Sequence, residues 1–262
     1  MKSLQIAATG MMAQELNVEV ISNNIANMRT TGFKRMRAEF QDLLYQDVEL
    51  VGSSTSDADT TDPTGIQLGF GVKTGATSRI MSQGNLSNTE KDLDLAIRGE
   101  GFFAITLPNG QTAYTRDGSF ELDPQGQLVT INGYQVQPGI TIPDNAKSIT
   151  INRTGGVEVV VGDDATPQEV GQLQLSRFIN KAGLKAMGDN LFVETPSSGS
   201  ATQGSPGDAG FGDVLQKFLE SANVNAVSEL TDLIAAQRAY EMNAKVISAS
   251  DEMMSATTNI VS

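Results

Sequence analysis

Several side chains that carry much of enzyme chemistry are missing from this 262-residue chain: it contains no cysteine, no histidine and no tryptophan. Without cysteine there can be no disulfide, thiol nucleophile or thiolate metal ligand, and without histidine no imidazole base or imidazole metal ligand. The net charge of −13 argues against general nucleic-acid binding. Carboxylate catalysis is the chemistry that remains, and no motif supports it. We therefore expect no enzyme activity, no cofactor, no nucleic-acid partner and no small-molecule substrate.

Long apolar runs are missing too. Polar residues interrupt the first twenty positions at Gln5, Gln14, Glu15, Asn17 and Glu19, so this stretch does not read as a cleaved signal peptide. No segment approaches the ~18 consecutive apolar residues that predict a membrane-spanning helix. We expect no membrane insertion, and export, if it occurs, without a cleaved signal.

Glycine and proline divide the chain into three parts. All 8 prolines and all but two of the 26 glycines lie in the middle, between positions 52 and 212. Because these residues interrupt helices, the two ends can be helical and the middle is rich in turns. The predicted fold class is α+β, with terminal helices paired as a coiled coil and an antiparallel all-β domain inserted between them.

Both ends show the 3,4 spacing of apolar residues that is typical of a coiled-coil seam. Near the N-terminus the row is Leu4, Ala7, Met11, Gln14, Val18, Ile21, Ile25 and Met28. Near the C-terminus it includes Ala226, Leu230, Leu233, Gln237, Tyr240, Ala244, Ile247, Asp251 and Met254, with Val227 and Ile234 beside it. Asn223 or Asn225 is suited to cap the C-terminal helix. We expect these two helices to pair with each other and to drive self-assembly.

The middle reads as antiparallel β-structure. Residues 101–138 alternate short apolar runs with Asn109-Gly110, Asp117-Gly118, Gln125-Gly126 and Asn132-Gly133, which are turn sequences suited to tight hairpins. Further strands are expected near 148–161 and 172–178. Residues 46–66 are rich in Ser, Thr and Asp and predict a flexible loop or an extended arm. Asp92 and Asp94 lack the spacing of a calcium loop, so we read them as a strand edge.

Four segments together resemble the family of flagellar rod and hook proteins. They are SNNIANMRTTGFKR (22–35), DLDLAIRGEGFFAI (92–105), YTRDGSFELDPQGQLVTINGYQVQP (114–138) and a C-terminal stretch at 219–254. The family motif at the first helix end comprises Ser22, Asn23, Asn24, Ile25, Ala26, Asn27, Thr30, Thr31, Gly32, Phe33 and Lys34. Arg29 departs from the pattern. The chain length and the short insert after AEFQDLLYQ (38–46) are similar to the distal rod members, whereas hook proteins are longer.

The resemblance implies a structural subunit that assembles into a straight, rigid helical tube and transmits motor torque to the hook. It implies type III export and a place in the basal body, crossing the periplasm to the outer membrane. The implied partners are identical subunits, proximal rod proteins, the hook protein, and the L-ring and P-ring proteins. The implied division is a helical domain (1–30 and 226–262), a connecting region (31–72 and 211–225) and an outer β domain (73–210).

Residue roles follow as hypotheses. We expect the amides of Asn23, Asn24 and Asn27 to cap the helix end and to bond to neighbouring helices. Gly32 is expected to adopt a left-handed conformation, and Phe33 to anchor the segment that follows. The insert is expected to keep the tube straight through the following residues: Val51, Gly52, Asp57, Asp59, Asp62 and Pro63.

Two other readings stay open. The chain could be a proximal rod or hook-like member of the same family. It could also be a secreted β-rich binding module, for example for glycan, on a coiled-coil stalk. A carboxylate-dependent enzyme is a third reading that the sequence gives no reason to prefer. Formation of a filament separates the first reading from the other two.

Overall fold

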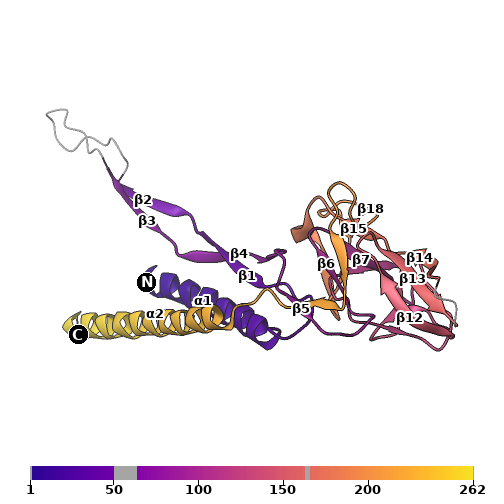
Figure 1. Ribbon diagram of the computed structural model, residues 1–262. Coiled ribbons are helices and arrows are strands. Elements are labelled where there is room, and N and C mark those ends of the chain that lie inside the picture. Colours follow the sequence, from indigo (N-terminus) through magenta and orange to yellow (C-terminus); the bar gives the residue numbers. More distant parts are fainter. Residues whose placement is uncertain (1, 50–63, 163–165, 262) are drawn as a thin grey trace. The chain divides into compact units, whose positions relative to one another are not determined.

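The computed structural model describes residues 2–49, 64–162 and 166–261, and these fall into two compact units. The first unit contains the described parts of 1–25, 36–78 and 226–262, and the second contains 26–35 and 79–225. The chain therefore passes between the units four times. The α+β class expected from the sequence is confirmed: two long helices stand beside an antiparallel β-structure (Figure 1).

The first unit is built from the two terminal helices and two β-ribbons. The helices are α1 (Lys2–Ala26) and α2 (Ala226–Val261), and the strands are β1 (Met36–Asp42), β2 (Tyr45–Glu49), β3 (Ile66–Gly69) and β4 (Val72–Arg79). β1 pairs with β4 and β2 with β3. The described ends of the predicted loop at 46–66 therefore belong to paired strands, because Tyr45 pairs with Gly69 and Gln46 with Leu68.

α1 contacts both the ribbons and α2. The Thr9 hydroxyl accepts a bond from the Val72 amide (3.3 Å), and the Lys2 ammonium lies 5.7 Å from the centre of the Phe70 ring. Along the other contact, Ser3 lies against Ser250 and Asn24 against Glu229, with their side chains bonded at 3.3 and 3.1 Å. The two helices therefore run antiparallel, side by side (Figure 1).

The second unit is organised around a nine-stranded antiparallel sheet. Its central path runs β16-β17-β8-β7-β11-β10-β9, with β15 beside β7 and β18 beside β15. The strands are β7 (Phe102–Thr106), β8 (Thr112–Thr115), β9 (Phe120–Leu122), β10 (Leu128–Thr130), β11 (Gln135–Val136), β15 (Leu175–Arg177), β16 (Lys185–Gly188), β17 (Leu191–Val193) and β18 (Thr202–Gly204). A 3₁₀ turn, η1 (Lys181–Gly183), precedes β16.

Smaller sheets complete this unit. They are β12-β13-β14 (Ala146–Ile151, Gly156–Val161 and Gln168–Gln172), β6-β19 (Leu95–Arg98 and Asp213–Gln216) and β5-β20 (Leu86–Asn88 and Phe218–Glu220). The strands expected near 148–161 and 172–178 are confirmed. In β6-β19 and β5-β20, a strand from the C-terminal side of the unit pairs with one that lies more than a hundred residues earlier.

Alternation along β7 places a core on each face of the sheet. Phe103 and Ile105 belong to the larger apolar cluster, which also includes Ile151 and Val157 of the three-stranded sheet. Phe102 and Ala104, pointing the other way, belong to a smaller cluster with Tyr114, Phe178 and Phe192. Such period-two burial is what a strand buried on both faces requires, and it fixes the register of the sheet.

Three of the four predicted turn sequences connect paired neighbouring strands. Gly110, Gly126 and Gly133 have φ of +80°, +76° and +79° at the β7–β8, β9–β10 and β10–β11 turns. Asp117-Gly118 differs, because β8 and β9 do not pair with each other. A Cβ at Gly118 would lie 1.6 Å from the Leu95 carbonyl oxygen, so glycine is required there by the close approach of another strand.

Candidate assembly site

Hydrogen bonds between residues close in sequence form the turn that follows α1. The Thr30 amide donates to the Asn27 carbonyl, and the Thr30 hydroxyl donates to the Asn27 side-chain oxygen, both at 3.1 Å. Gly32 then adopts φ +68° as predicted, and its amide donates to the Glu220 carbonyl at 2.7 Å. A Cβ on Gly32 would lie 2.8 Å from the backbone of Arg116, so both the torsion and the space demand glycine. Phe33 is buried beside it.

Asn24 is fully buried and bonded within the first unit. Its side-chain oxygen accepts the Met36 amide and its NH₂ donates to the Met36 carbonyl, both at 2.8 Å, so it pairs with the first residue of β1 as a strand would. The NH₂ also donates to the carboxylate of Glu229 on α2 (3.1 Å). Asn24 therefore bonds to α2 of its own chain and also holds the strand that follows.

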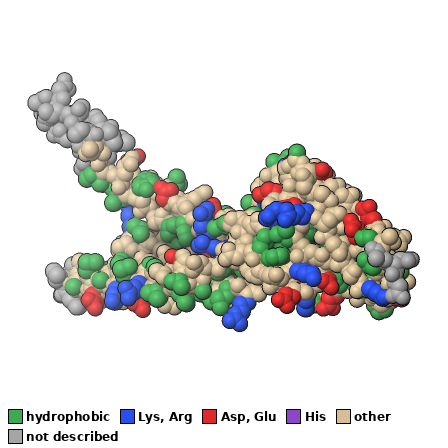
Figure 2. Space-filling view, in the orientation of Figure 1, with side chains coloured by type: hydrophobic (Ala, Val, Ile, Leu, Met, Phe, Trp, Pro, Cys, Tyr) green, Lys and Arg blue, Asp and Glu red, His purple; other side chains and the backbone are tan. Residues whose placement is uncertain are grey.

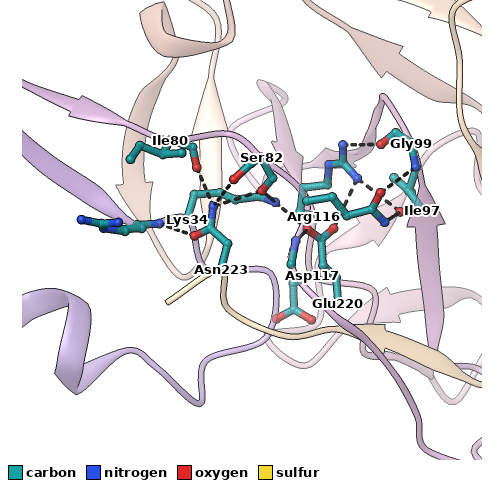
Figure 3. A network of polar contacts seen from close by, with 12 residues as sticks. Lys34, Ile80, Ser82, Ile97, Gly99, Arg116, Asp117, Glu220 and Asn223 are labelled. Atoms are coloured by element: carbon teal, nitrogen blue, oxygen red, sulfur yellow. Dashed lines mark hydrogen bonds and ion pairs between the residues drawn. The ribbon is translucent and has the colours of Figure 1, made fainter. Parts of the chain in front are cut away.

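A buried charged network lies in the second unit (Figure 3). The Lys34 ammonium donates to the Glu220 carboxylate (2.5 Å) and to the Ser82 carbonyl (2.8 Å). The Arg116 guanidinium donates to the other Glu220 oxygen (3.3 Å) and to the Gly99 carbonyl (2.7 Å). These charged side chains are at most 3% exposed. Charge-assisted bonds of this kind are strong when all the partners are present and costly when one of them is missing.

Asn223 bonds two further stretches of the chain, at Arg35 and at Ile80–Ser82. Its side-chain oxygen accepts the Arg35 amide at 2.7 Å. Its NH₂ donates to the Ile80 carbonyl (2.8 Å) and to the Ser82 carbonyl (3.0 Å). Asn223, one of the two candidate caps for α2, therefore acts as a polar tie between the parts of the chain that enter and leave the second unit (Figure 3). Asn225, directly before Ala226, occupies the N-cap position.

The network carries two cations and one anion. Burial lowers the pKa of Lys34 below its usual value, and the neighbouring Glu220 carboxylate opposes that shift. Burial likewise lowers the pKa of Arg116, again opposed by Glu220. Gly84 donates its amide to Glu220 at 2.8 Å, so this single carboxylate is bound by three donors from distant parts of the chain.

The predicted assembly residues on the helices differ in burial. On α1, Ala7 and Ile21 are buried, Leu4, Met11, Gln14, Val18 and Ile25 are half-buried, and Met28, beyond the helix end, is exposed. On α2, Ala226, Leu233, Ala244, Ile247 and Met254 are half-buried, whereas Leu230 and Tyr240 are exposed. The buried positions of α2 are Glu229, Ala236 and Ser250, which lie on a row next to the predicted one. In the motif, Ser22, Asn23 and Ala26 are exposed, and Thr31 is half-buried.

The residues expected to straighten the tube (Val51, Gly52, Asp57, Asp59, Asp62 and Pro63) lie outside the described residues. Elsewhere, Asp94 forms a bridge with Ser119 and accepts the Lys217 amide, and Asp92 pairs with Lys217 on the surface, which agrees with a strand edge. Across 2–49, 64–162 and 166–261, no cluster of acidic side chains has the arrangement of a metal site. No helix in those ranges is long and apolar enough to span a membrane.

Sequence reasoning missed the roles of Glu220, Arg116 and Glu229 in these contacts, and it considered Asn223 only as a possible helix cap. A signal was present, since all four lie inside the segments that carry the family resemblance. What the sequence does not provide is the pairing, because Lys34 and Glu220 are 186 residues apart.

The sequence families that match this chain define its class as flagellar rod and hook proteins. Three such families match: "Flagella basal body rod protein" over 4–34, "Flagellar hook protein FlgE/F/G D1 domain" over 96–159, and "Flagellar basal body rod FlgEFG protein C-terminal" over 215–260. The matched ranges contain Lys34, Arg116, Glu220 and Asn223, so the buried network joins all three.

Comparison with individual proteins identifies the family within this class. The chain is 58% identical to the flagellar basal-body rod protein FlgG of Caulobacter vibrioides, over 99% of both chains. It is 52% identical to FlgG of Agrobacterium fabrum over 97% of both, and 47% identical to FlgG of Borreliella burgdorferi over 99% of this chain and 98% of that one. The chain belongs to the FlgG family of flagellar basal-body rod proteins and is a structural rod subunit of the flagellum.

Proposed function

We propose that this protein is the distal rod subunit, and that its copies build a straight, rigid helical tube that transmits motor torque to the hook. The observation that carries this proposal is the surface of the two helices. Large apolar side chains remain exposed on both of them, including Leu230 (50%) and Ile234 (51%), which are neighbours on one face of α2. Figure 2 shows hydrophobic side chains distributed along the helices, interspersed with basic and acidic ones.

Such a surface suits a subunit that is covered by copies of itself. A helix facing only water carries charged and polar residues over its outer face, whereas α2 also exposes Val227, Met242, Val246 and Met253. Contacts of this kind, repeated head to tail without closing, generate an open helical filament. We propose that α1 and α2 pair as a coiled coil in this tube, with Leu4, Met11, Val18 and Leu230 among the residues that contact neighbouring subunits.

The three-part division predicted from the sequence belongs to this proposal: helices form the inner tube, a connecting region surrounds them, and the β-unit forms the outer wall. In the monomer the apolar rows lack their neighbours, so we propose that the helices become fully ordered on assembly. That behaviour suits export through the flagellar type III channel without a cleaved signal. The proposed location is the basal body, from the periplasm to the outer membrane. The proposed partners are proximal rod proteins, the hook protein, and the L-ring and P-ring proteins.

Residues 46–66 are the proposed source of straightness. Their described ends form the β2–β3 ribbon, which exposes Tyr45, Val48, Ile66 and Leu68 and so presents apolar side chains to a neighbouring subunit. A segment that reaches from one subunit to the next blocks the sliding by which a tube bends. Deletion of residues 46–63 should give curved tubes in electron micrographs. Straight tubes from this variant would refute the proposed role of the segment in keeping the tube straight.

The decisive experiment compares tube formation by electron microscopy for the full-length chain, a chain lacking residues 1–30, and a Leu230→Gln, Ile234→Gln variant. We expect straight tubes from the full-length chain alone. A Lys245→Gln variant, also exposed on α2, is the matched control and should form tubes normally. The glutamines replace exposed residues, so monomer stability should change by no more than about 0.5 kcal/mol per site. Normal tubes from the double variant would refute the proposed contact, and curved tubes from the parent would favour a hook-like member.

A further inference from the structure

The contacts between α1 and α2 share one register. Ser3 faces Ser250, with the two hydroxyl oxygens 3.3 Å apart, and Asn24 faces Glu229 at 3.1 Å. Between them, Gly10 lies so close to Asn243 that a Cβ on Gly10 would be 2.8 Å from the asparagine nitrogen. In every pair the two residue numbers add to the same value, so a single antiparallel register runs along the whole contact.

The residues of this contact also share a chemical type. They recur every seven positions on each helix, as Ser3, Gly10, Asn17 and Asn24 on α1 and as Glu229, Ala236, Asn243 and Ser250 on α2. The common register places Asn17 opposite Ala236, which is buried. All eight side chains are small or polar, although apolar rows lie next to them on both helices. We call these eight residues the polar seam.

A polar seam contributes specificity rather than strong attraction. Apolar side chains tolerate a shift of one heptad, because any two of them pack acceptably, whereas a buried amide or carboxylate is satisfied only opposite its own partner. Here Asn24 bonds Glu229, and Gly10 provides the space that Asn243 occupies. A slip of one heptad would place Asn17 against Asn243 and would leave Glu229 beyond the end of α1.

We propose that the polar seam fixes the register of α1 against α2 within one chain and thereby regulates self-assembly. It aligns the exposed apolar rows of the two helices into one composite surface for the next subunit. Because it buries little apolar side chain, it leaves the helix pair dependent on neighbouring subunits for most of its stability. The inference rests on the proposed function for its purpose, but the register itself is a property of the single chain.

The absence of cysteine makes the register directly measurable by disulfide formation. A Ser3→Cys, Ser250→Cys chain reports the observed register, and a Ser3→Cys, Thr257→Cys chain reports a slip of one heptad without altering any other seam residue. We expect intramolecular oxidation at least about tenfold faster for the first pair than for the second, because the slip separates bonded partners. Equal rates would overturn the proposal.

Seam variants then test what sets the register. Asn17→Leu with Asn243→Leu brings the two leucines together in the slipped arrangement, so the ratio of rates should fall below about threefold. Asn243→Leu alone should lower it partly, and this variant serves if the double variant loses helical circular dichroism. The matched control, Gln5→Leu with Gln237→Leu, replaces exposed residues and should leave the ratio unchanged. An unchanged ratio in the folded seam variants would show that the register is set elsewhere and would overturn the proposal.

Tube formation is scored separately, with the same chains under reducing conditions. If the parent forms no tubes, the proposed function fails while the measured ratio still decides the register. If the parent forms tubes and the folded seam variants form equally regular ones, the seam does not regulate assembly and that part of the inference is wrong.

Discussion

Replacing Glu220 by glutamine should destabilise the second unit far more than replacing Lys34 by methionine. Within the described part of the chain, this carboxylate is the anion that bonds to both Lys34 and Arg116, and it also accepts the Gly84 amide. Glutamine leaves two buried cations without a bonded anion, and only the half-exposed carboxylate of Glu100 still acts electrostatically on both of them. Removing one partner of a buried ion pair in this way costs about 3–5 kcal/mol. For a domain of 150–250 residues each kcal/mol moves Tm by about 2–4 °C, so we expect a loss of roughly 10 °C.

The Lys34→Met change removes charge in the opposite sense. It leaves Arg116 and Glu220 as a one-to-one pair. It also removes the buried ammonium, whose desolvation lowers the pKa of Lys34. Both acceptors of Lys34 keep another donor, since Ser82 is also bonded by Asn223 and Glu220 by Gly84. We therefore expect a loss of only about 1–2 kcal/mol.

Urea unfolding, followed by tyrosine fluorescence or circular dichroism, measures both values. The surface pair Asp92–Lys217 provides the control, and Asp92→Asn should change stability by less than about 0.5 kcal/mol. The reasoning is refuted if the glutamine and methionine variants lose the same stability, or if the glutamine variant loses less than about 1 kcal/mol.

Three further predictions concern the same unit. Gly32→Ala should destabilise it by about 2 kcal/mol or more and Gly133→Ala by only about 1 kcal/mol in thermal unfolding, because both need positive φ but only Gly32 meets backbone at 2.8 Å. The hydrogen bonds from Arg98 hold the pKa of Asp213 below its usual value. The folded chain therefore binds fewer protons than the unfolded one, so this stabilisation is present above pH ~4 and is lost as pH falls through the lowered pKa. Arg98→Gln should weaken the loss of stability on acidification, measured as the free energy of unfolding against pH. An unchanged loss of stability in acid would contradict the assignment. Asn223→Ala should cost about 2–4 kcal/mol, since it removes a polar tie among three segments, and the amide of residue 35 should lose protection in hydrogen exchange.

The sequence by itself determined the elements that depend on local chemistry. Helices at 2–26 and 226–261 follow from apolar spacing together with the scarcity of glycine and proline at both ends. Hairpins at Gly110, Gly126 and Gly133 follow from turn residues that accept positive φ. The FlgG family follows from motif segments that are contiguous in sequence and need no knowledge of their spatial partners.

Only the tertiary structure decided which of several compatible partners each residue meets. Apolar spacing favoured the row through Met11 and Leu230, yet α1 and α2 touch through the adjacent polar row, because small side chains allow close approach and amides bond specific partners. Asp117-Gly118 has the composition of a hairpin turn, but its glycine instead allows the close approach of another strand. The Lys34–Glu220 pair joins residues 186 positions apart, and no local pattern encodes a pairing that arises when distant strands fold into one unit.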